Sequence, residues 1–322
     1  MAKLIIIIPI FLTVFNLCSC KNEANQNTQI NAGKGAEQIH AAFYNNTGSK
    51  IALSSSSGKL YITDDTFKLL HSIQAHTGNA NSCFFSLDDQ HVITGGKDKL
   101  LKIWSANDLA SERVYDFKFN SYTSVYGYNT LGGCGENGKT VIYNLKTRDT
   151  LNIDLEKDGA YHLYYLEPDS ALVISSGLTG YEIDLIHRRI VHRYSGHEGQ
   201  VYCIMPSHTR KLVVTASADS ILRIFDRNNE KLLHHSISLD GQLFVATFDP
   251  TDNVVAASTS SGSIYFLDGT LSHIIMKIPA FKGRINTIHF SPDGTRILAG
   301  SEGGGAKIFS TSDGKLLYEF KY

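Results

Sequence analysis

The sequence has no excess of either charge and few cysteines. Its 30 basic and 31 acidic residues nearly cancel, which argues against a nucleic-acid or anionic-membrane surface built from clustered lysine and arginine. Beyond Cys20 the cysteines are Cys83, Cys134 and Cys203, an odd number without CxxC spacing. This pattern excludes a zinc ribbon and disfavours a disulfide framework. The apolar surroundings of Cys83 and Cys203 instead predict small buried side chains.

Catalytic and metal-binding motifs are also missing. No GxSxG or HExxH stretch occurs, and the carboxylates are scattered, so no catalytic residue can be nominated. His187, His192 and His197 recur every five residues, a spacing that turns neighbouring side chains of a strand to opposite faces, as it does for His234–His235. We therefore predict no metal site, no cofactor and no enzyme activity.

One stretch matches a nucleotide-binding formula. Gly133 to Thr140 reads GCGENGKT and fits GxxxxGK[ST], whose chemistry requires a strand before the loop and a helix after it. The residues that follow, Val141 to Tyr143, have the composition of a strand instead. We interpret these glycines as a strand-to-strand turn and predict no nucleotide binding.

No apolar run is long enough for a membrane span, but the N-terminus has the features of an export signal. Lys3 precedes an apolar run from Leu4 to Phe15, about a dozen residues where a span needs roughly 20. The run leads to Leu17-Cys18-Ser19-Cys20, which resembles the bacterial lipobox. That resemblance implies cleavage after residue 19, a lipid on Cys20 and, because Lys21 follows, an outer-membrane destination. The alternative is an ordinary secretory signal with two incidental cysteines.

The segment after the signal is polar. Residues 20–38 are rich in Asn, Gln and Gly without periodicity, which is typical of a flexible tether. We predict three parts: a signal peptide at 1–19, the tether at 20–38 and a folded body at 39–322.

The body is a sevenfold repeat. Aligned on the only Trp, the repeats place one residue each at intervals of 39 to 42 positions: Thr63, Trp104, Tyr143, Ile183, Phe225, Leu267 and Phe309. A tight-turn signal precedes each of these positions. The last copy shows four strands, at 284–290, 296–301, 306–310 and 315–322, with the turn Ser291-Pro292-Asp293-Gly294 between the first two. Such a period is typical of a propeller with four-stranded blades.

The repeats resemble the WD-repeat (tryptophan-aspartate) propeller family over residues 39–322. The resemblance implies an all-β, seven-bladed β-propeller of four-stranded antiparallel blades. It also implies a hydrogen-bonded tetrad, complete in the second blade at His76, Thr94, Asp98 and Trp104. The fifth blade keeps His197, Thr215 and Asp219 but has Phe225 in the Trp position. We interpret these residues as structural, and expect the other five blades to rely on apolar packing alone.

Ring closure is expected to depart from the family pattern. Family members close the ring by adding an N-terminal strand to the last blade, whereas each blade here has four strands of its own. We predict closure by packing between blades, without a strand from the N-terminal tail along 316–320.

The narrow face of the disc is the candidate binding surface, because loops enter each innermost strand there. The first residues of those strands are predicted to be His40, Asn81, Thr123, Tyr161, Tyr202, Phe244 and Asn286. The charged turn residues Lys97, Glu136, Arg284 and Glu302 lie nearby. The candidate protein-binding rim consists of His40, Tyr161, Tyr202, Phe244, Arg284, Lys97 and Glu302, a composition typical of protein-binding patches. The alternative is that the aromatic rings only fill space between blades.

Three functions remain open at this point. The favoured one is a non-enzymatic scaffold, lipid-anchored in a bacterial envelope, that binds protein partners and touches the membrane only through its N-terminal lipid. The second is an exported propeller enzyme or carbohydrate-binding protein that uses the central channel, which would place several ionisable side chains at equivalent positions of the innermost strands. The third is a eukaryotic intracellular scaffold, which requires that the signal is not cleaved.

Overall fold

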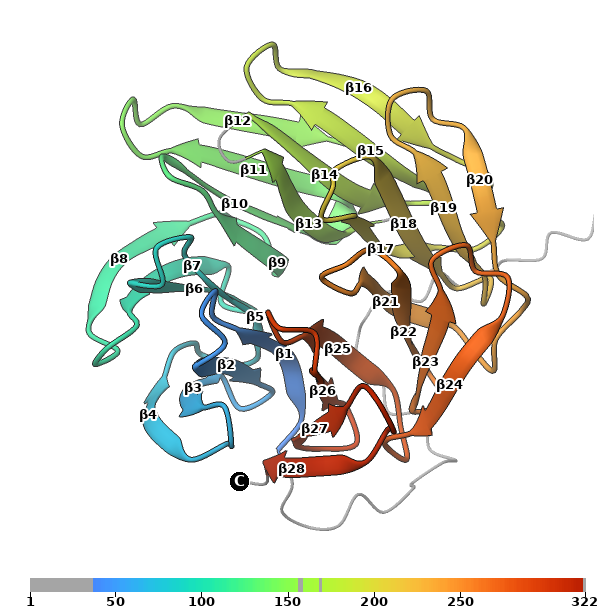
Figure 1. Cartoon of the computed structure of the whole chain (residues 1–322). Coiled ribbons are helices and arrows are strands. Elements are labelled where there is room, and N and C mark those ends of the chain that lie inside the picture. Colours follow the sequence, from blue (N-terminus) through green and yellow to red (C-terminus); the bar gives the residue numbers. More distant parts are fainter. Residues whose placement is uncertain (1–36, 156–158, 168–169, 321–322) are drawn as a thin grey trace, which may run out of the picture. The chain divides into compact units, whose positions relative to one another are not determined.

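The computed structural model describes residues 37–155, 159–167 and 170–320. The predicted signal peptide, Cys20 and nearly all of the predicted tether lie outside the described residues. Within the described part, the chain forms seven four-stranded antiparallel sheets, arranged as the blades of a propeller (Figure 1). The predicted fold class is confirmed.

The first four blades are consecutive in the chain. Blade 1 consists of β1 (Ile39–Tyr44), β2 (Lys50–Ser55), β3 (Lys59–Asp64) and β4 (Leu69–Gln74). Blade 2 consists of β5 (Ala80–Phe85), β6 (His91–Gly96), β7 (Leu100–Ser105) and β8 (Ser111–Asp116). Blade 3 consists of β9 (Ser121–Tyr126), β10 (Thr130–Gly135), β11 (Lys139–Asn144) and β12 (Thr150–Asp154). Blade 4 consists of β13 (Ala160–Glu167), β14 (Ala171–Ser176), β15 (Thr179–Asp184) and β16 (Arg189–Tyr194).

The last three blades follow the same order. Blade 5 consists of β17 (Val201–Pro206), β18 (Leu212–Ser217), β19 (Leu222–Asp226) and β20 (Leu232–His235). Blade 6 consists of β21 (Leu243–Phe248), β22 (Val254–Thr259), β23 (Ser263–Asp268) and β24 (Ile274–Pro279). Blade 7 consists of β25 (Ile285–Phe290), β26 (Arg296–Ser301), β27 (Ala306–Ser310) and β28 (Leu316–Phe320). The strand limits expected for this blade agree with the observed ones to within two residues.

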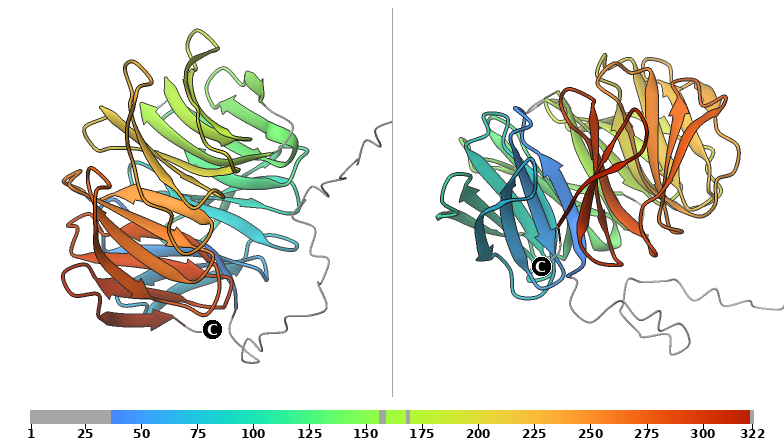
Figure 2. Two further views of the ribbon diagram at one scale, coloured as in Figure 1. Left: turned by 90° about the vertical axis from the view of Figure 1, so that its right-hand side faces the viewer. Right: turned by 60° about the horizontal axis from the view of Figure 1, so that its bottom comes forward.

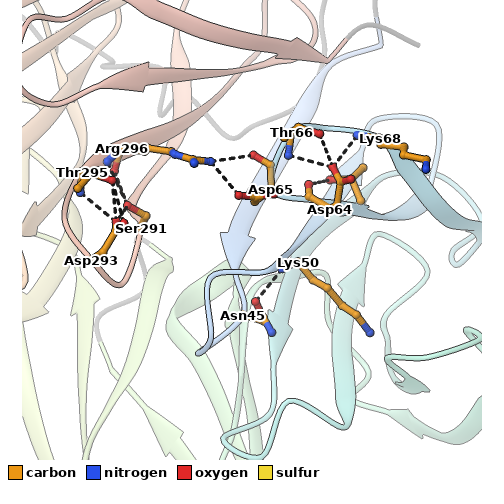
Figure 3. Close-up of polar contacts among 11 residues, drawn as sticks. Asn45, Lys50, Asp64, Asp65, Thr66, Lys68, Ser291, Asp293, Thr295 and Arg296 are labelled. Carbon is orange, nitrogen blue, oxygen red and sulfur yellow. Dashed lines mark hydrogen bonds and ion pairs between the residues drawn. The ribbon is translucent and has the colours of Figure 1, made fainter.

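Local sequence determines the hairpins within each blade. In blade 7 the turn after β25 places Gly294 at φ 72°, in the left-handed region that glycine adopts at little cost. The Asp293 carboxylate accepts hydrogen bonds from Ser291 Oγ (2.5 Å) and from the backbone N–H of Thr295 (3.0 Å) (Figure 3). These contacts lie within the hairpin itself, so they favour the β25–β26 pairing without help from another blade.

The core lies between the blades. The second strand of a blade is buried along most of its length, as in β2 and β26, whereas outer strands such as β8 are largely exposed. Neighbouring blades pack face to face around the ring (Figure 2). Blades 5 and 6, for example, share an apolar cluster that joins Leu222 and Ile224 to Val255 and Ala257. Burial of this area is the main contribution to stability.

Packing between blades 7 and 1 closes the ring. One apolar cluster joins Ile39 and Leu53 of blade 1 to Leu298 and Ile308 of blade 7. The strands approach so closely that a Cβ at Gly300 would lie 2.7 Å from the Ile39 side chain. Among the described residues, β28 pairs with β27 alone and no fifth strand is added to its sheet. The predicted tether lies almost entirely outside the described residues, so its lack of pairing along 316–320 stays a prediction.

Polar contacts also join blades 7 and 1. The Arg296 guanidinium of blade 7 donates to the Asp65 carboxylate of blade 1 (2.9 Å) and also contacts the Asp65 carbonyl (3.3 Å) (Figure 3). The Asn286 amide donates to the carbonyl of Ile39 (3.0 Å).

No helix among the described residues has the length and apolarity that a membrane crossing requires.

Candidate functional site

A β-bulge near the start of each innermost strand shapes the candidate rim. In all seven blades the pairing with the second strand slips by one residue there, which leaves one residue unpaired. The unpaired residues are His40, Asn81, Tyr122, Tyr161, Tyr202, Phe244 and Asn286. The innermost strands β1, β5, β9, β13, β17, β21 and β25 surround the ring axis (Figure 1). Bulges redirect side chains and are over-represented next to functional sites.

The predicted member from blade 3 is wrong by one residue. Ser121 pairs with Gly135 and Thr123 pairs with Cys134, so Tyr122 is the bulged residue. Thr123 instead donates from its hydroxyl to the carbonyl of Tyr161 in the next blade (2.9 Å). Spacing from the aligned Trp position could not detect the error. A usable signal was present, since Tyr122 follows a small buried residue as Tyr161 does.

Four of the bulged residues form a continuous aromatic arc (Tyr122, Tyr161, Tyr202 and Phe244). Tyr122 and Tyr161 stack at 5.5 Å between ring centroids, and Tyr161 meets Tyr202 edge-on at 5.3 Å. Tyr202 and Phe244 stack at 4.7 Å. The rings are half-buried, so each is fixed by its neighbour and still reaches the surface. Contact geometries of this kind are favourable for aromatic pairs.

The arc ends on a cation. The guanidinium of Arg284 lies 4.8 Å from the centroid of the Phe244 ring, within the range of a cation–π contact. Arg284 also pairs with Glu302 (3.2 Å) and donates to the Asn286 side-chain oxygen (2.9 Å). The structure therefore places the predicted rim residues Tyr161, Tyr202, Phe244, Arg284 and Glu302 in one connected group.

The remaining rim positions are polar. Asn81 donates to the Asn120 side chain and to the Ser121 carbonyl, both at 2.8 Å. Burial lowers the pKa of His40, although a hydrogen bond with Asn81 acts in the opposite direction. Lys97 lies in an exposed turn after β6, where its backbone N–H donates to the carbonyl of Asn79 (2.9 Å). His40 also interacts electrostatically with Arg284 and Glu302 at the end of the arc.

The tetrad of blade 2 is assembled as a chain of hydrogen bonds. The indole N–H of Trp104 donates to Thr94 Oγ1 (2.9 Å), and Thr94 Oγ1 lies 2.8 Å from His76 Nε2. The ionised Asp98 carboxylate can only accept, so His76 carries a proton on Nδ1. Burial lowers the pKa of His76 and keeps its ring neutral, so Nε2 accepts from the Thr94 hydroxyl, which in turn accepts from the indole. The Nδ1 proton is donated to the Asp98 carboxylate (2.8 Å). A Cβ at Gly96 would overlap the His76 ring, which explains the glycine there.

The pKa shifts agree with this assignment. Burial lowers the pKa of His76, despite the opposing effect of Asp98. Burial alone would raise the pKa of Asp98, but hydrogen bonds from His76 and from the backbone N–H groups of Thr77 and Leu100 hold it below its usual value. The pair therefore consists of a neutral imidazole and a carboxylate, both nearly buried, and has the geometry of a structural link.

Blade 5 has the same arrangement without the indole. His197 lies 2.8 Å from Asp219 and 2.7 Å from the Thr215 hydroxyl. The Arg223 guanidinium contacts both His197 and Asp219, and its distance to the carboxylate is 2.8 Å. Phe225 is fully buried against the Tyr194 ring. A buried ion pair and an aromatic contact thus occur where the tryptophan is missing.

The expectation that the other five blades rely on apolar packing alone is wrong. In blade 1 the Glu37 carboxylate accepts hydrogen bonds from Ser55 (2.7 Å), Ser57 and Tyr61. In blade 6 Asp240 accepts from Ser261 (3.0 Å) and Lys277 (2.6 Å). Both carboxylates lie in the segment that enters the blade, where His76 and His197 lie in blades 2 and 5.

Blade 4 also contains a polar link. Arg227 of blade 5 binds Glu182 through two nitrogens (2.8 and 3.0 Å), and the Tyr194 hydroxyl donates to the same carboxylate (3.0 Å). Glu182 is almost completely buried. Blades 1, 4 and 6 thus each have a carboxylate that is held by hydrogen-bond donors, but they have no His-Asp pair. A search for that pair therefore misses them.

A second aromatic group lies further along the innermost strands. Phe43 contacts Phe84 (4.9 Å) and His289 (5.1 Å), and Phe84 reaches Tyr164 of blade 4 (6.2 Å). Blades 2 and 4 are not neighbours, so this last contact passes the axial side of blade 3. Burial lowers the pKa of His162 and of His289 to about 4, and neither Nδ1 atom has a described hydrogen-bond partner.

The remaining sequence candidates are placed as follows. Gly133 to Thr140 forms the end of β10, a 3-10 turn (Glu136–Gly138) and the start of β11, which are paired antiparallel. Cys83, Cys134 and Cys203 are buried free thiols, and burial raises the pKa of Cys83 and Cys203 to about 12. Within the described ranges, no group of three or more His, Cys, Asp or Glu residues could hold a metal ion.

Comparison with known proteins supports the repeat assignment. The family model "WD domain, G-beta repeat" matches residues 67–105, 188–226 and 273–310. Each match runs from the outer strand of one blade through the third strand of the next, as in β4 to β7. The chain therefore contains WD repeats, and its fold is the seven-bladed propeller that the resemblance implied.

Several curated eukaryotic proteins are similar to the chain. Apoptotic protease-activating factor 1 of Danio rerio is 21% identical over 302 residues, covering 87% of this chain and 24% of that protein. Eukaryotic translation initiation factor 3 subunit I of Bombyx mori is 22% identical over 268 residues, covering 72% of this chain and 79% of that protein. Its counterpart from Bos taurus is 30% identical over 139 residues, covering 40% of this chain and 42% of that protein. The chain spans 24% of the Danio rerio protein and 32% of periodic tryptophan protein 2 homolog of Dictyostelium discoideum, to which it is 23% identical over 296 residues, or 81% of this chain.

Proposed function

We propose that this WD-repeat propeller is a non-enzymatic scaffold that binds a protein partner at the aromatic arc and is anchored by a lipid at Cys20 in a bacterial envelope, on the outer membrane. The observation that supports partner binding is the arc itself. Tyr122, Tyr161, Tyr202 and Phe244 contact one another in sequence, through two stacked pairs and one edge-on pair, and the arc ends on Arg284.

The physical reason is that the arc combines the residue types of interface hot spots with rigidity. Tyrosine and arginine are enriched at hot spots, which lie in well-packed surroundings. Here the bulges fix the backbone and each ring is held by the next, so binding costs little side-chain entropy. The charged pair Arg284–Glu302 at the end of the arc offers an orienting contact for a peptide or a loop of the partner.

The arc is tested by co-purification from the native envelope after cross-linking. Tyr202→Ala and Phe244→Ala should each reduce capture of one and the same partner at least tenfold, about 1.4 kcal/mol or more. Tyr128→Ala is the matched control, because Tyr128 is 71% exposed and lies outside the arc. Equal capture of that partner by all four proteins, with unchanged melting temperatures, would show that the arc only fills space.

The lipid anchor is supported by Leu17-Cys18-Ser19-Cys20 and by the charged and apolar residues before it. The side of the outer membrane is left open. Mass spectrometry of the mature N-terminus tests the anchor: a chain that begins at Cys20 and carries acyl mass is expected. Recovery of an unmodified Met1 would favour an intracellular scaffold and would leave the arc experiment unaffected.

A further inference from the structure

Five of the outer strands carry an aliphatic pair at one repeated position. The first residue of the pair is opposite the aligned Trp position, and the second follows it in the chain. The pairs are Leu69–Leu70 in blade 1, Ile190–Val191 in blade 4, Leu232–Leu233 in blade 5, Ile274–Ile275 in blade 6 and Leu316–Leu317 in blade 7. Blades 2 and 3 have Ser111–Glu112 and Thr150–Leu151 instead.

Exposure is greatest on three consecutive blades. We call their six residues the aliphatic edge: Leu232 (41% exposed), Leu233 (38%), Ile274 (37%), Ile275 (53%), Leu316 (49%) and Leu317 (43%). In each of β20, β24 and β28 the second residue is bulged out of the ladder, so one partner residue faces two aliphatic ones. Apolar residues repeated along neighbouring surfaces in this way are a mark of an interaction site.

A lysine or histidine directly precedes each pair of the aliphatic edge. Lys231, His273 and Lys315 come directly before the pairs of blades 5, 6 and 7, and all three are exposed. Blade 3 has Asp149 at this position, and blade 2 has Ala110. His273 lies 3.3 Å from Asp268, and Lys315 pairs with Asp313 (2.8 Å). A lysine next to two exposed aliphatic residues matches the layering of a lipid surface, in which phosphates lie outside and acyl chains inside.

The described chain begins at blade 7, at the end of its strands opposite to Leu316 and Leu317: Glu37 hydrogen-bonds to Gly305, which precedes Ala306, the partner of Phe320. Glu37 lies at the seam of blades 7 and 1, where its carbonyl accepts from the backbone N–H of Gly305 (2.8 Å) and its carboxylate binds Ser55. From Cys20 to Glu37 there are 17 peptide steps, 37 minus 20, which span at most about 60 Å. A lipid on Cys20 would thus hold the seam within reach of a membrane. The outer strands β20, β24 and β28 follow one another around the ring from that seam (Figure 1).

We propose that the aliphatic edge rests on the lipid bilayer, with its leucine and isoleucine side chains inserted between the headgroups and its basic side chains at the phosphates. This inference rests on the proposed lipid anchor. Contact through an outer edge turns the ring axis toward the membrane plane, and this orientation leaves the aromatic arc open to a partner. It adds to the N-terminal lipid a second membrane contact, which fixes the orientation of the disc.

The test measures depth in the bilayer at single positions. Ile275→Cys and Leu317→Cys variants of the mature lipidated protein are labelled with an environment-sensitive dye and reconstituted in vesicles of phosphatidylethanolamine and phosphatidylglycerol. The native thiols Cys83, Cys134 and Cys203 are buried, so labelling is selective. Glu112→Cys is the matched control, because Glu112 is the bulged residue at the same position of blade 2.

Both edge probes should be quenched by spin-labelled lipid at least about threefold more than the Glu112 probe, with blue-shifted emission. Equal quenching at all three positions would overturn the proposal. A blue shift without lipid quenching would also overturn it, because a second copy or another protein then covers the edge. Mass spectrometry of the same sample shows whether Cys20 is acylated. If it is not, the unacylated chain is added to preformed vesicles and the same quenching is measured. The proposed anchor and the proposed insertion of the aliphatic edge are then tested separately.

Discussion

At the scale of single residues, the directions of the hydrogen bonds show that the tetrad of blade 2 is a structural link. The sequence alone indicates that His76, Thr94, Asp98 and Trp104 meet, because their spacing follows the repeat. It does not give the proton positions. The Asp98 carboxylate fixes them, because it can only accept from His76 Nδ1. Burial keeps the imidazole neutral, so its Nε2 accepts from the Thr94 hydroxyl. A neutral, fully bonded histidine holds a loop in place and is unsuited to proton transfer.

Asp98→Ala is therefore expected to act on stability. It removes the acceptor for His76 and for the backbone N–H groups of Thr77 and Leu100, and stranding these donors should cost about 1–3 kcal/mol. Urea denaturation followed by the emission of Trp104, the only tryptophan, measures the change directly. Partner capture at the arc should be unaffected at temperatures where the variant is folded. Loss of capture with an unchanged unfolding midpoint would instead make Asp98 part of the binding site.

The polar links of blades 1 and 6 show where prediction from residue identity fails. Glu37 and Asp240 lie in the entering segments, where blades 2 and 5 have histidine, and they bind hydroxyl groups of the following turn. Their positions are recognisable only if the search is for any buried polar partner rather than for the His-Asp pair. Burial of a carboxylate without donors is costly, so the serines opposite were the available signal.

At the scale of strands and hairpins, the sequence is far more informative. Turn residues and strand alternation are local, so the strand limits of blade 7 could be predicted to within two residues. The bulge of blade 3 was missed, because counting from the aligned Trp position does not show where the pairing of β9 with β10 slips by one residue. Because of this slip, Thr123 was predicted in place of Tyr122, and one of the four rings of the aromatic arc was missed.

The seam between blades 7 and 1 allows its apolar and ionic contacts to be compared. Phe320 is 3% exposed and contacts Tyr61 (5.3 Å) and Phe67 (5.6 Å) of blade 1. Phe320→Ala should cost about 3–5 kcal/mol through lost contacts and the cavity left behind. Arg296→Ala should cost less than about 1 kcal/mol, because both side chains of its ion pair are partly exposed. Chemical denaturation of the two variants gives the comparison, and a larger loss for Arg296→Ala would show that the ion pair closes the ring.

At the scale of the whole molecule, neutral histidines are spread around the ring. His76, His162, His197 and His289 belong to blades 2, 4, 5 and 7, and burial lowers the pKa of each. Their protonation would place charge at the axis or between blades. The fold therefore depends on four uncharged imidazoles at once, which couples its stability to pH through every part of the disc.

Acid should consequently destabilise the protein well before its carboxylates titrate. An unfolded histidine takes up a proton below about pH 6.5, whereas folded His162 and His289 do so only near pH 4, so the free energy of unfolding falls across that window by up to about 3 kcal/mol for each of the two. Asp98 and Asp219 have lowered pKa values, so their contributions are complete above about pH 4 and are lost only at lower pH.

His289→Phe should flatten the dependence of the unfolding free energy on pH between 6.5 and 4, since Phe43 already packs against that ring. His235→Phe, at an exposed position, is the control and should leave the slope unchanged. Equal slopes for the two variants would mean that His289 is protonated in the folded ring.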